Sequence, residues 1–298
     1  MYYAYSPVSS LSAPLCELND KNVSNIRKQS VRKQVVCATI VSFLAGLSMK
    51  SSLASELDTE THYTEEGIAY VELGNPSSDY RLIFIHGSPG SKEGYQDYLS
   101  DPWLLDHAQL ISVDRIGYGQ SPNRLETKIS QQSKHLQPLL ASNKKNIVVG
   151  HSLGGPIALS LALQMPELVN GLVFVAPAFD PELETPKWYN ILADTWLIGL
   201  FLNQNWSMSN GEMMTLADEL SLLSAKDWQI LNKIPVTLIH GDQDTIADPD
   251  NSIFAMRHLS GQLKKLVKVE GEGHFILWKN PSKIIAEIKQ MIEIMPKT

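Results

Sequence analysis

Cysteine is nearly missing from this sequence, which has two cysteines, Cys16 and Cys37, among 298 residues. So few thiols exclude a disulfide scaffold and a cysteine-rich zinc site. Basic side chains are also scarce, 25 against 32 acidic ones, which gives a formal charge of −7. That balance argues against a protein that binds nucleic acid by neutralising phosphates with lysine and arginine.

Charged residues make up 19% of the chain and hydrophobic residues 43%, which is typical of a globular protein. A disordered, collagenous or coiled-coil protein is therefore excluded, and no internal repeat or low-complexity tract is found. The length suits one large α/β domain or two smaller domains.

The first 54 residues have the layout of a secretory leader. Four basic residues at 27, 28, 32 and 33 precede an apolar run over 35–47, and Ser52-Leu53-Ala54 follows as a small-residue exit. The run is shorter than the roughly 20 residues of a membrane-spanning helix. We predict cleavage after Ala54 and export to the periplasm or medium; the alternative is a retained membrane anchor. Because the stretch before the apolar run is long for a leader, a further hypothesis is that translation starts at Val23 or Val31. The chain after Ala54 has a charge of −11 and no cysteine.

From about residue 67, short apolar runs alternate with helix-like stretches. Runs of this kind, rich in β-branched residues and bounded by glycine or proline, indicate buried parallel strands. The expected strands are 81–86, 109–113, 146–149, 171–175, 235–239 and 263–269, and the expected helices are 127–140, 153–164 and 281–294. This alternation predicts an α/β fold with a mostly parallel, doubly wound sheet.

One segment interrupts the alternation. Residues 181–233 contain no convincing strand and hold four of the six tryptophans. We predict a helical cap at 181–233, inserted between two core parts at 55–180 and 234–298. The run of lysines at 264, 265 and 268 is interpreted as a solvated edge rather than a binding patch.

The sharpest motif is Gly150-His151-Ser152-Leu153-Gly154, placed directly after an expected strand and before an expected helix. A serine on such a tight strand-to-helix turn exposes its hydroxyl, and the flanking glycines permit close backbone approach. Ser152 is therefore the candidate nucleophile, and the backbone N–H of Leu153 is a candidate donor to a developing oxyanion.

A second motif, His86-Gly87-Ser88-Pro89-Gly90, also ends an expected strand. Its glycine-rich turn can present the backbone N–H of Ser88 as the other oxyanion donor. His86 is interpreted as a packed structural residue, since only one catalytic base is needed.

An acid and a base follow Ser152 along the chain. His274, after the last expected strand, would take the serine proton, and Asp244, after the strand before it, would orient the imidazole. Asp242 lies too near its strand end and Asp248 lies further along the loop, while Asp180 is the remaining alternative.

Five motifs together carry a family resemblance: HGSPG at 86–90, DRIGYGQS at 114–121, GHSLGG at 150–155, HGDQD at 240–244 and GEGHF at 271–275. With them, residues from about 65 to 298 resemble the α/β-hydrolase superfamily. The resemblance implies Ser152 as nucleophile, Asp244 as acid, His274 as base and a variable helical cap at 181–233. It implies a structural turn around Asp114.

The resemblance also limits the reactions that we expect. Haloalkane dehalogenases and epoxide hydrolases of this fold use an aspartate where Ser152 stands. Proline iminopeptidases and carbon–carbon bond hydrolases usually have different glycine-rich turns, so HGSPG departs from both. We expect a carboxylic ester hydrolase that acts on a small-molecule substrate and needs no metal or organic cofactor. A carbon–carbon bond hydrolase, a lactonase or a perhydrolase is the alternative, and a non-catalytic binder is disfavoured because the triad residues are all present.

Tryptophans and methionines of the expected cap bear on the substrate. Trp188, Trp196 and Met213 are candidates for an apolar wall around a small to medium ester. The equally simple interpretation is that they pack the cap onto the core. The sequence does not indicate the oligomeric state or the physiological substrate.

Overall fold

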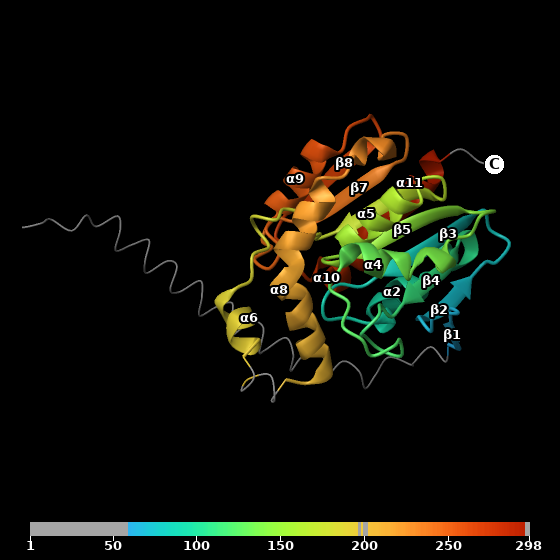
Figure 1. Ribbon diagram of the computed structural model, residues 1–298. Helices are drawn as coiled ribbons and strands as arrows, with labels where there is room; N and C mark the ends of the chain where they lie inside the picture. The colour runs from blue at the N-terminus through green and yellow to red at the C-terminus, as the bar shows by residue number, and fades with distance from the viewer. Residues whose placement is uncertain (1–58, 196–197, 199–201, 296–298) are drawn as a thin grey trace, which may run out of the picture. The chain divides into compact units, whose positions relative to one another are not determined.

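The computed structural model describes residues 59–195, 198 and 202–295 (Figure 1). The expected leader at 1–54 and the candidate Trp196 lie outside these residues. One eight-stranded sheet forms the centre of the described part, in the order β1-β2-β4-β3-β5-β6-β7-β8. Its strands are β1 (Thr61–Tyr63), β2 (Ala69–Gly74), β3 (Tyr80–Ile85), β4 (Gln109–Val113), β5 (Lys145–His151), β6 (Val169–Val175), β7 (Val236–Gly241) and β8 (Lys264–Val269).

The six strands from β4 to β8 in this order run parallel, and β1 and β2 are antiparallel additions at one edge. All residues of β4 and β7 are buried, as expected for strands covered on both faces. The predicted fold class, a mostly parallel doubly wound sheet, is confirmed.

Helices cover both faces of the sheet, and the 3₁₀ turns are labelled η. In chain order they are η1 (Lys92–Tyr95), α2 (Gln96–Leu99), α3 (Pro102–His107), α4 (Ile129–Lys134), η2 (Gln137–Leu139), α5 (Gly154–Gln164), α6 (Trp188–Ala193), α8 (Gln204–Ser224), η3 (Trp228–Leu231), α9 (Asp250–His258), α10 (Ile276–Lys279) and α11 (Pro281–Ile294).

Two apolar cores follow from the alternation of side chains along the strands. Ile83 and Ile85 of β3 point into a core with α4, α5, α8 and α9, whereas Leu82 and Phe84 point into a core with α2, α3, α10 and α11. Each face of the sheet is therefore covered by packed helices.

Two expectations differ from the structure. The expected helix 127–140 is divided into α4 and η2, because Pro138 lies in the first turn of η2 and cannot donate to a continuous helix. Strands β1 and β2 are not among the expected strands. Strand β1 has only three residues, and Glu72 interrupts the apolar sequence of β2, so neither contains a continuous apolar run.

The 181–233 segment contains α6, α8 and η3, and its described part contains no strand. Helix α8 passes over the α4 and α5 side of the sheet (Figure 1). That this segment acts as a cap stays a prediction. Among the described residues, no helix combines the length and apolar character needed to cross a membrane.

Strand β8 forms the sheet edge opposite β1 and pairs with β7. Its sequence, KKLVKV, places Lys265 and Lys268 in exposed positions. The lysine run thus lies on a sheet edge.

Candidate active site

The candidate residues converge because they follow parallel strands at the same sheet edge. Ser152 follows β5, His86 to Ser88 follow β3, and Asp244 and His274 follow β7 and β8. The chain passes from β3 to β4 on one side and then to β5 on the other, so β3 and β5 flank the point where the winding direction reverses. Ligands of open α/β sheets bind at such a point.

The turn between β5 and α5 holds Ser152 in a strained conformation. Its φ of 54° lies in the left-handed region, which is uncommon for a residue other than glycine. Gly150 and Gly154 make the turn possible, since a Cβ on either would come within 2.3 Å of a backbone oxygen. The strain is held by the surrounding structure and presents the hydroxyl beyond the strand end.

Ser152, His274 and Asp244 form a hydrogen-bonded series. The Ser152 hydroxyl lies 3.1 Å from Nε2 of His274, and Nδ1 of His274 lies 2.8 Å from Oδ2 of Asp244. Since the carboxylate only accepts, His274 carries its proton on Nδ1 and can receive another on Nε2. The structure therefore brings the three predicted residues together in an order suited to proton transfer.

Asp244 is buried and accepts four hydrogen bonds. Oδ2 accepts from His274 and from Nε2 of His240 at 3.2 Å, and Oδ1 accepts from the backbone N–H groups of Ile246 and Ala247. Burial alone would raise the pKa of Asp244, but the hydrogen bonds from both histidines outweigh it and hold the pKa well below its usual range. Asp244 is thus a fixed negative charge behind His274.

The other aspartates considered have different partners. Oδ1 of Asp242 accepts from the N–H of Gly271, and Oδ1 of Asp248 accepts from the N–H of Asp250. Oδ1 of Asp180 accepts from the N–H of Glu182. Asp248 and Asp180 each stabilise a local turn, whereas Asp242 links the loop after β7 to the loop after β8.

The turn after β3 passes directly over the serine. A Cβ on Gly87 would lie 2.9 Å from Cβ of Ser152, so only glycine allows this approach. Ser88 follows Gly87, and Leu153 is the N-cap residue of α5. In the described part of the chain, the backbone N–H groups of Ser88 and Leu153 have no hydrogen-bond acceptor. Both are available to a ligand oxygen.

The sequence analysis assigned no role to two histidines that lie behind the site, His240 and His151. His240 lies at the end of β7. Its Nε2 donates to Oδ2 of Asp244 at 3.2 Å, and its Nδ1 lies 2.7 Å from the Ser252 hydroxyl oxygen. His151 lies 3.1 Å, by Nε2, from the carbonyl oxygen of His274. Burial, and to a smaller degree His274, lowers the pKa of His151 to about 3, so this ring is neutral. Both histidines belong to motifs quoted above, His151 to GHSLGG and His240 to HGDQD. Their place in these motifs is the signal by which the sequence could have identified them as part of the site.

Two of the three residues proposed for an apolar wall lie in the described part of the chain, and their surroundings differ. Trp188 on α6 is 63% exposed, and Met213 on α8 packs against the core around α5. Trp196 lies outside the described residues. A substrate-contacting role for these three stays a prediction.

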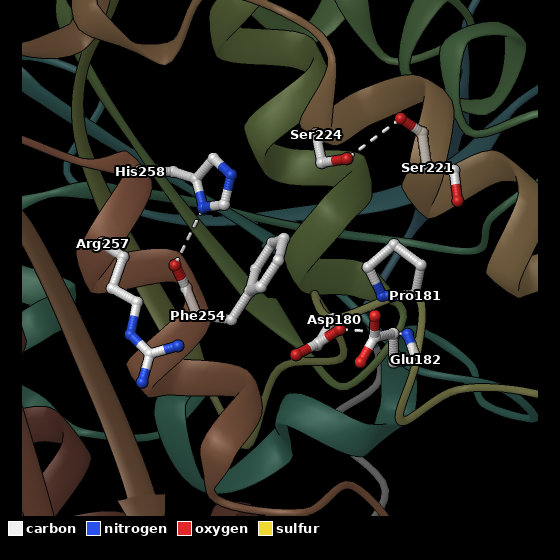
Figure 2. Close-up of a pocket in the computed structure, with 8 residues that line it drawn as sticks. All are labelled: Asp180, Pro181, Glu182, Ser221, Ser224, Phe254, Arg257 and His258. Atoms are coloured by element: carbon white, nitrogen blue, oxygen red, sulfur yellow. Dashed lines mark hydrogen bonds between the residues drawn. The ribbon is translucent and has the colours of Figure 1, made fainter.

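A separate surface pocket of about 480 Å³ lies between the 180–182 loop, the end of α8 and α9. Figure 2 shows Arg257 and His258 on one side of Phe254 and the Asp180–Glu182 loop on the other. None of its lining residues belongs to the Ser152–His274–Asp244 series. Across the described residues, no group of three or more His, Cys, Asp or Glu side chains could hold a metal ion.

Comparisons with known proteins place these features in context. Residues 82–288 match the family model described as the alpha/beta hydrolase family. The chain is 33% identical to mouse sn-1-specific diacylglycerol lipase ABHD11 over 110 residues, 36% of each protein. It is 30% identical to ethanol acetyltransferase 1 of Cyberlindnera fabianii over 120 residues, 37% of this chain and 34% of that one. The chain thus spans about a third of the length of these curated relatives.

A solved structure supports the same fold. The monoacylglycerol lipase of Paleococcus ferrophilus superposes with a TM-score of 0.59 at 19% identity, covering 76% of this chain and 98% of the other. At that identity the likeness concerns the fold.

Proposed function

Because the chain belongs to the alpha/beta hydrolase family, we propose that it is a serine hydrolase of carboxylic esters. The observation that carries the proposal is the series from Ser152 through His274 to Asp244, with distances of 3.1 and 2.8 Å. Lipases among the similar proteins add support for an ester substrate.

The acylation step uses each member of the series. Oγ of Ser152 attacks the acyl carbon while its proton moves to Nε2 of His274, and Asp244 stabilises the imidazolium that forms. The N–H groups of Ser88 and Leu153 donate to the oxygen that gains negative charge. The imidazolium then gives its proton to the departing alcohol oxygen, which leaves an acyl-enzyme.

The second half of the reaction returns the enzyme to its starting state. His274 takes a proton from a water molecule, whose oxygen attacks the acyl carbon. Collapse of the second tetrahedral intermediate breaks the bond to Ser152, and the proton returns to Oγ. The products are the carboxylic acid and the alcohol.

The finer substrate class is also part of the proposal. We infer small to medium apolar acyl groups, with side chains of the 181–233 segment forming part of the wall. Hydrolysis restricted to acetate esters would count against this inference.

Ester hydrolysis is tested with a panel of p-nitrophenyl esters of rising acyl length. The Ser152→Ala variant is assayed in parallel, and a fluorophosphonate labels the active serine. We expect wild-type activity and labelling that both disappear in the variant. Absence of hydrolysis by folded wild-type protein would contradict the proposal and would favour a carbon–carbon bond or peptide substrate.

A further inference from the structure

A buried arginine lies behind the turn that carries Ser88. Arg115 follows β4 and is 1% exposed. All five of its N–H donors are used: Nε and Nη2 donate to the carbonyl oxygens of His86 and Gly87, and the remaining donors bind side chains of α4 and α8. A guanidinium with no free donor is held in a single orientation.

The contact with Gly87 fixes a particular peptide unit. The Gly87 carbonyl oxygen accepts from Nη2 of Arg115 at 2.8 Å and from Nδ1 of His86 at 2.7 Å, which uses both of its lone pairs. This carbonyl and the N–H of Ser88 belong to one planar trans unit, so they point in opposite directions. Holding the carbonyl on one side therefore aims the Ser88 N–H to the other.

The tautomer of His86 agrees with this arrangement. Nε2 of His86 accepts from the backbone N–H of Arg115 at 3.0 Å, so the ring proton lies on Nδ1 and can be donated to Gly87. Burial, with Arg115 adding to it, holds the pKa of His86 well below its ordinary value. The neutral ring keeps one donor and one acceptor.

The charge that balances Arg115 comes from the 181–233 segment. Glu212 on α8 is 3% exposed and lies 2.6 Å, by Oε1, from Nη1 of Arg115. Its Oε2 also accepts from the Ser88 hydroxyl at 2.5 Å and from the Tyr118 hydroxyl at 2.7 Å. One carboxylate thus binds both the arginine and the side chain of the turn.

We propose that Arg115 and Glu212 are positioning residues for the oxyanion donor at Ser88. Arg115 orients the Gly87–Ser88 peptide from behind, and Glu212 holds Arg115 and the Ser88 side chain from α8. The inference rests on the proposed ester hydrolysis, in which the Ser88 N–H donates to the developing oxyanion. Through Glu212, helix α8 therefore helps to hold the turn that carries the Ser88 N–H.

The effect on rate follows from how oxyanion donors act. A donor accelerates the reaction only when it is already aimed at the developing charge, and losing one donor costs roughly 10²–10³ in kcat. A peptide that can rotate loses part of that factor. We therefore expect a lower kcat with little change in KM.

The test must avoid leaving a lone charge in the core, since breaking a buried ion pair is strongly destabilising. We choose the double variant Arg115→Met/Glu212→Met, because replacing both charges by apolar side chains is often neutral for stability. Measurements are kcat and KM on the best p-nitrophenyl ester, and Ki for a trifluoromethyl ketone, whose hemiketal oxygen occupies the same donors. We expect kcat to fall roughly 10- to 100-fold, KM to stay within about threefold, and Ki to rise by the same factor as kcat/KM falls.

A second variant keeps the test decisive if the double variant does not fold. Arg115→Lys preserves the charge opposite Glu212 but cannot span both carbonyl oxygens with a planar fork, so the same pattern is expected. Lys265→Met/Glu287→Met, which removes an ion pair between β8 and α11, is the matched control and should keep kcat unchanged.

Two results would overturn the inference in distinguishable ways. If either Arg115 variant is folded and keeps kcat and Ki within about threefold of wild type, the positioning role is wrong while ester hydrolysis stands. If the wild-type activity does not depend on Ser152, the proposed function fails and the inference fails with it.

Discussion

Asp244 shows how much of the candidate site depends on one charge. Its carboxylate faces Nδ1 of His274 at 2.8 Å and is held by three further donors. Asp244→Asn would remove the charge that stabilises the imidazolium and would favour the wrong histidine tautomer. We expect kcat on p-nitrophenyl esters to fall by roughly 10³- to 10⁴-fold with a nearly unchanged KM.

A neighbouring carboxylate provides the control for that change. Asp242 is exposed and accepts a hydrogen bond from Gly271, away from His274. Asp242→Asn should leave kcat close to the wild-type value. Equal losses in the two variants would contradict the assignment of Asp244.

His151 gives the protein a measurable sensitivity to acid. Because its pKa in the folded chain is about 3 against 6.5 ordinarily, the unfolded chain binds the proton more readily between these values. The stability that neutral His151 contributes is therefore complete above about pH 6.5 and is lost as the pH falls toward 3. In His151→Gln, the loss of unfolding free energy between pH 6 and pH 4 should be smaller by about 2 kcal/mol.

Urea unfolding at a series of pH values measures this difference. Glutamine is chosen because its amide can still donate to the carbonyl oxygen of His274. His86 is buried and neutral in both proteins, so its contribution cancels, and replacement of the exposed His107 is the control. Parallel pH profiles for wild type and His151→Gln would refute the prediction.

At this scale the sequence predicts best where a motif fixes local geometry. Ser152, Asp244 and His274 each follow a strand in a recognisable pattern, and they meet in the structure. The contacts of Arg115 with Glu212 and of His151 with His274 join residues 97 and 123 positions apart. Such contacts depend on tertiary packing, so no local sequence pattern predicts them.

At the scale of elements, the approach of α5 to β3 depends on a missing side chain. A Cβ on Gly154 would lie 2.3 Å from the carbonyl oxygen of Ile85 and 2.8 Å from that of His86. Gly154→Ala would therefore force the helix away from the strand. We expect the unfolding free energy to fall by about 2–4 kcal/mol, with a parallel loss of activity because Ser152 lies on the same turn.

Thermal or urea unfolding measures that change. Gly94→Ala is the control, since its Cβ would meet ordinary contacts at 3.7 Å from Trp278. We expect the control to stay within about 0.5 kcal/mol of wild type. A Gly154→Ala protein as stable as the control would show that α5 can move without cost.

Most of the elements were predictable from the pattern of apolar residues along the chain. The six parallel strands and the helices α5 and α11 follow from apolar runs and from helical spacing. The order of strands in the sheet was not predictable, because neighbouring strands are chosen by long-range pairing. Strands β1 and β2 were not predicted, because β1 has only three residues and Glu72 interrupts the apolar sequence of β2.

At the scale of the whole molecule, the remaining proposal concerns the first 54 residues, which lie outside the described structure. We propose export with cleavage after Ala54, on the basis of the basic flank, the apolar run and the small-residue exit. Expression of the full chain in a bacterium, followed by N-terminal sequencing of the exported product, should give Ser55 as the first residue. A product that keeps the leader, or remains attached to the membrane, would favour the anchor.

The lysines of β8 have a consequence for how the protein behaves at high concentration. An edge strand offers its outer row of backbone groups to any other strand, which is how sheets extend into fibrils. Lys265 is paired with Glu287, but a second copy docking there in register would set its own Lys268 against that of the first. Charge repulsion thus opposes polymerisation from this edge, and it weakens as salt screens the lysines. We therefore expect concentrated protein to resist polymerisation longest at low ionic strength.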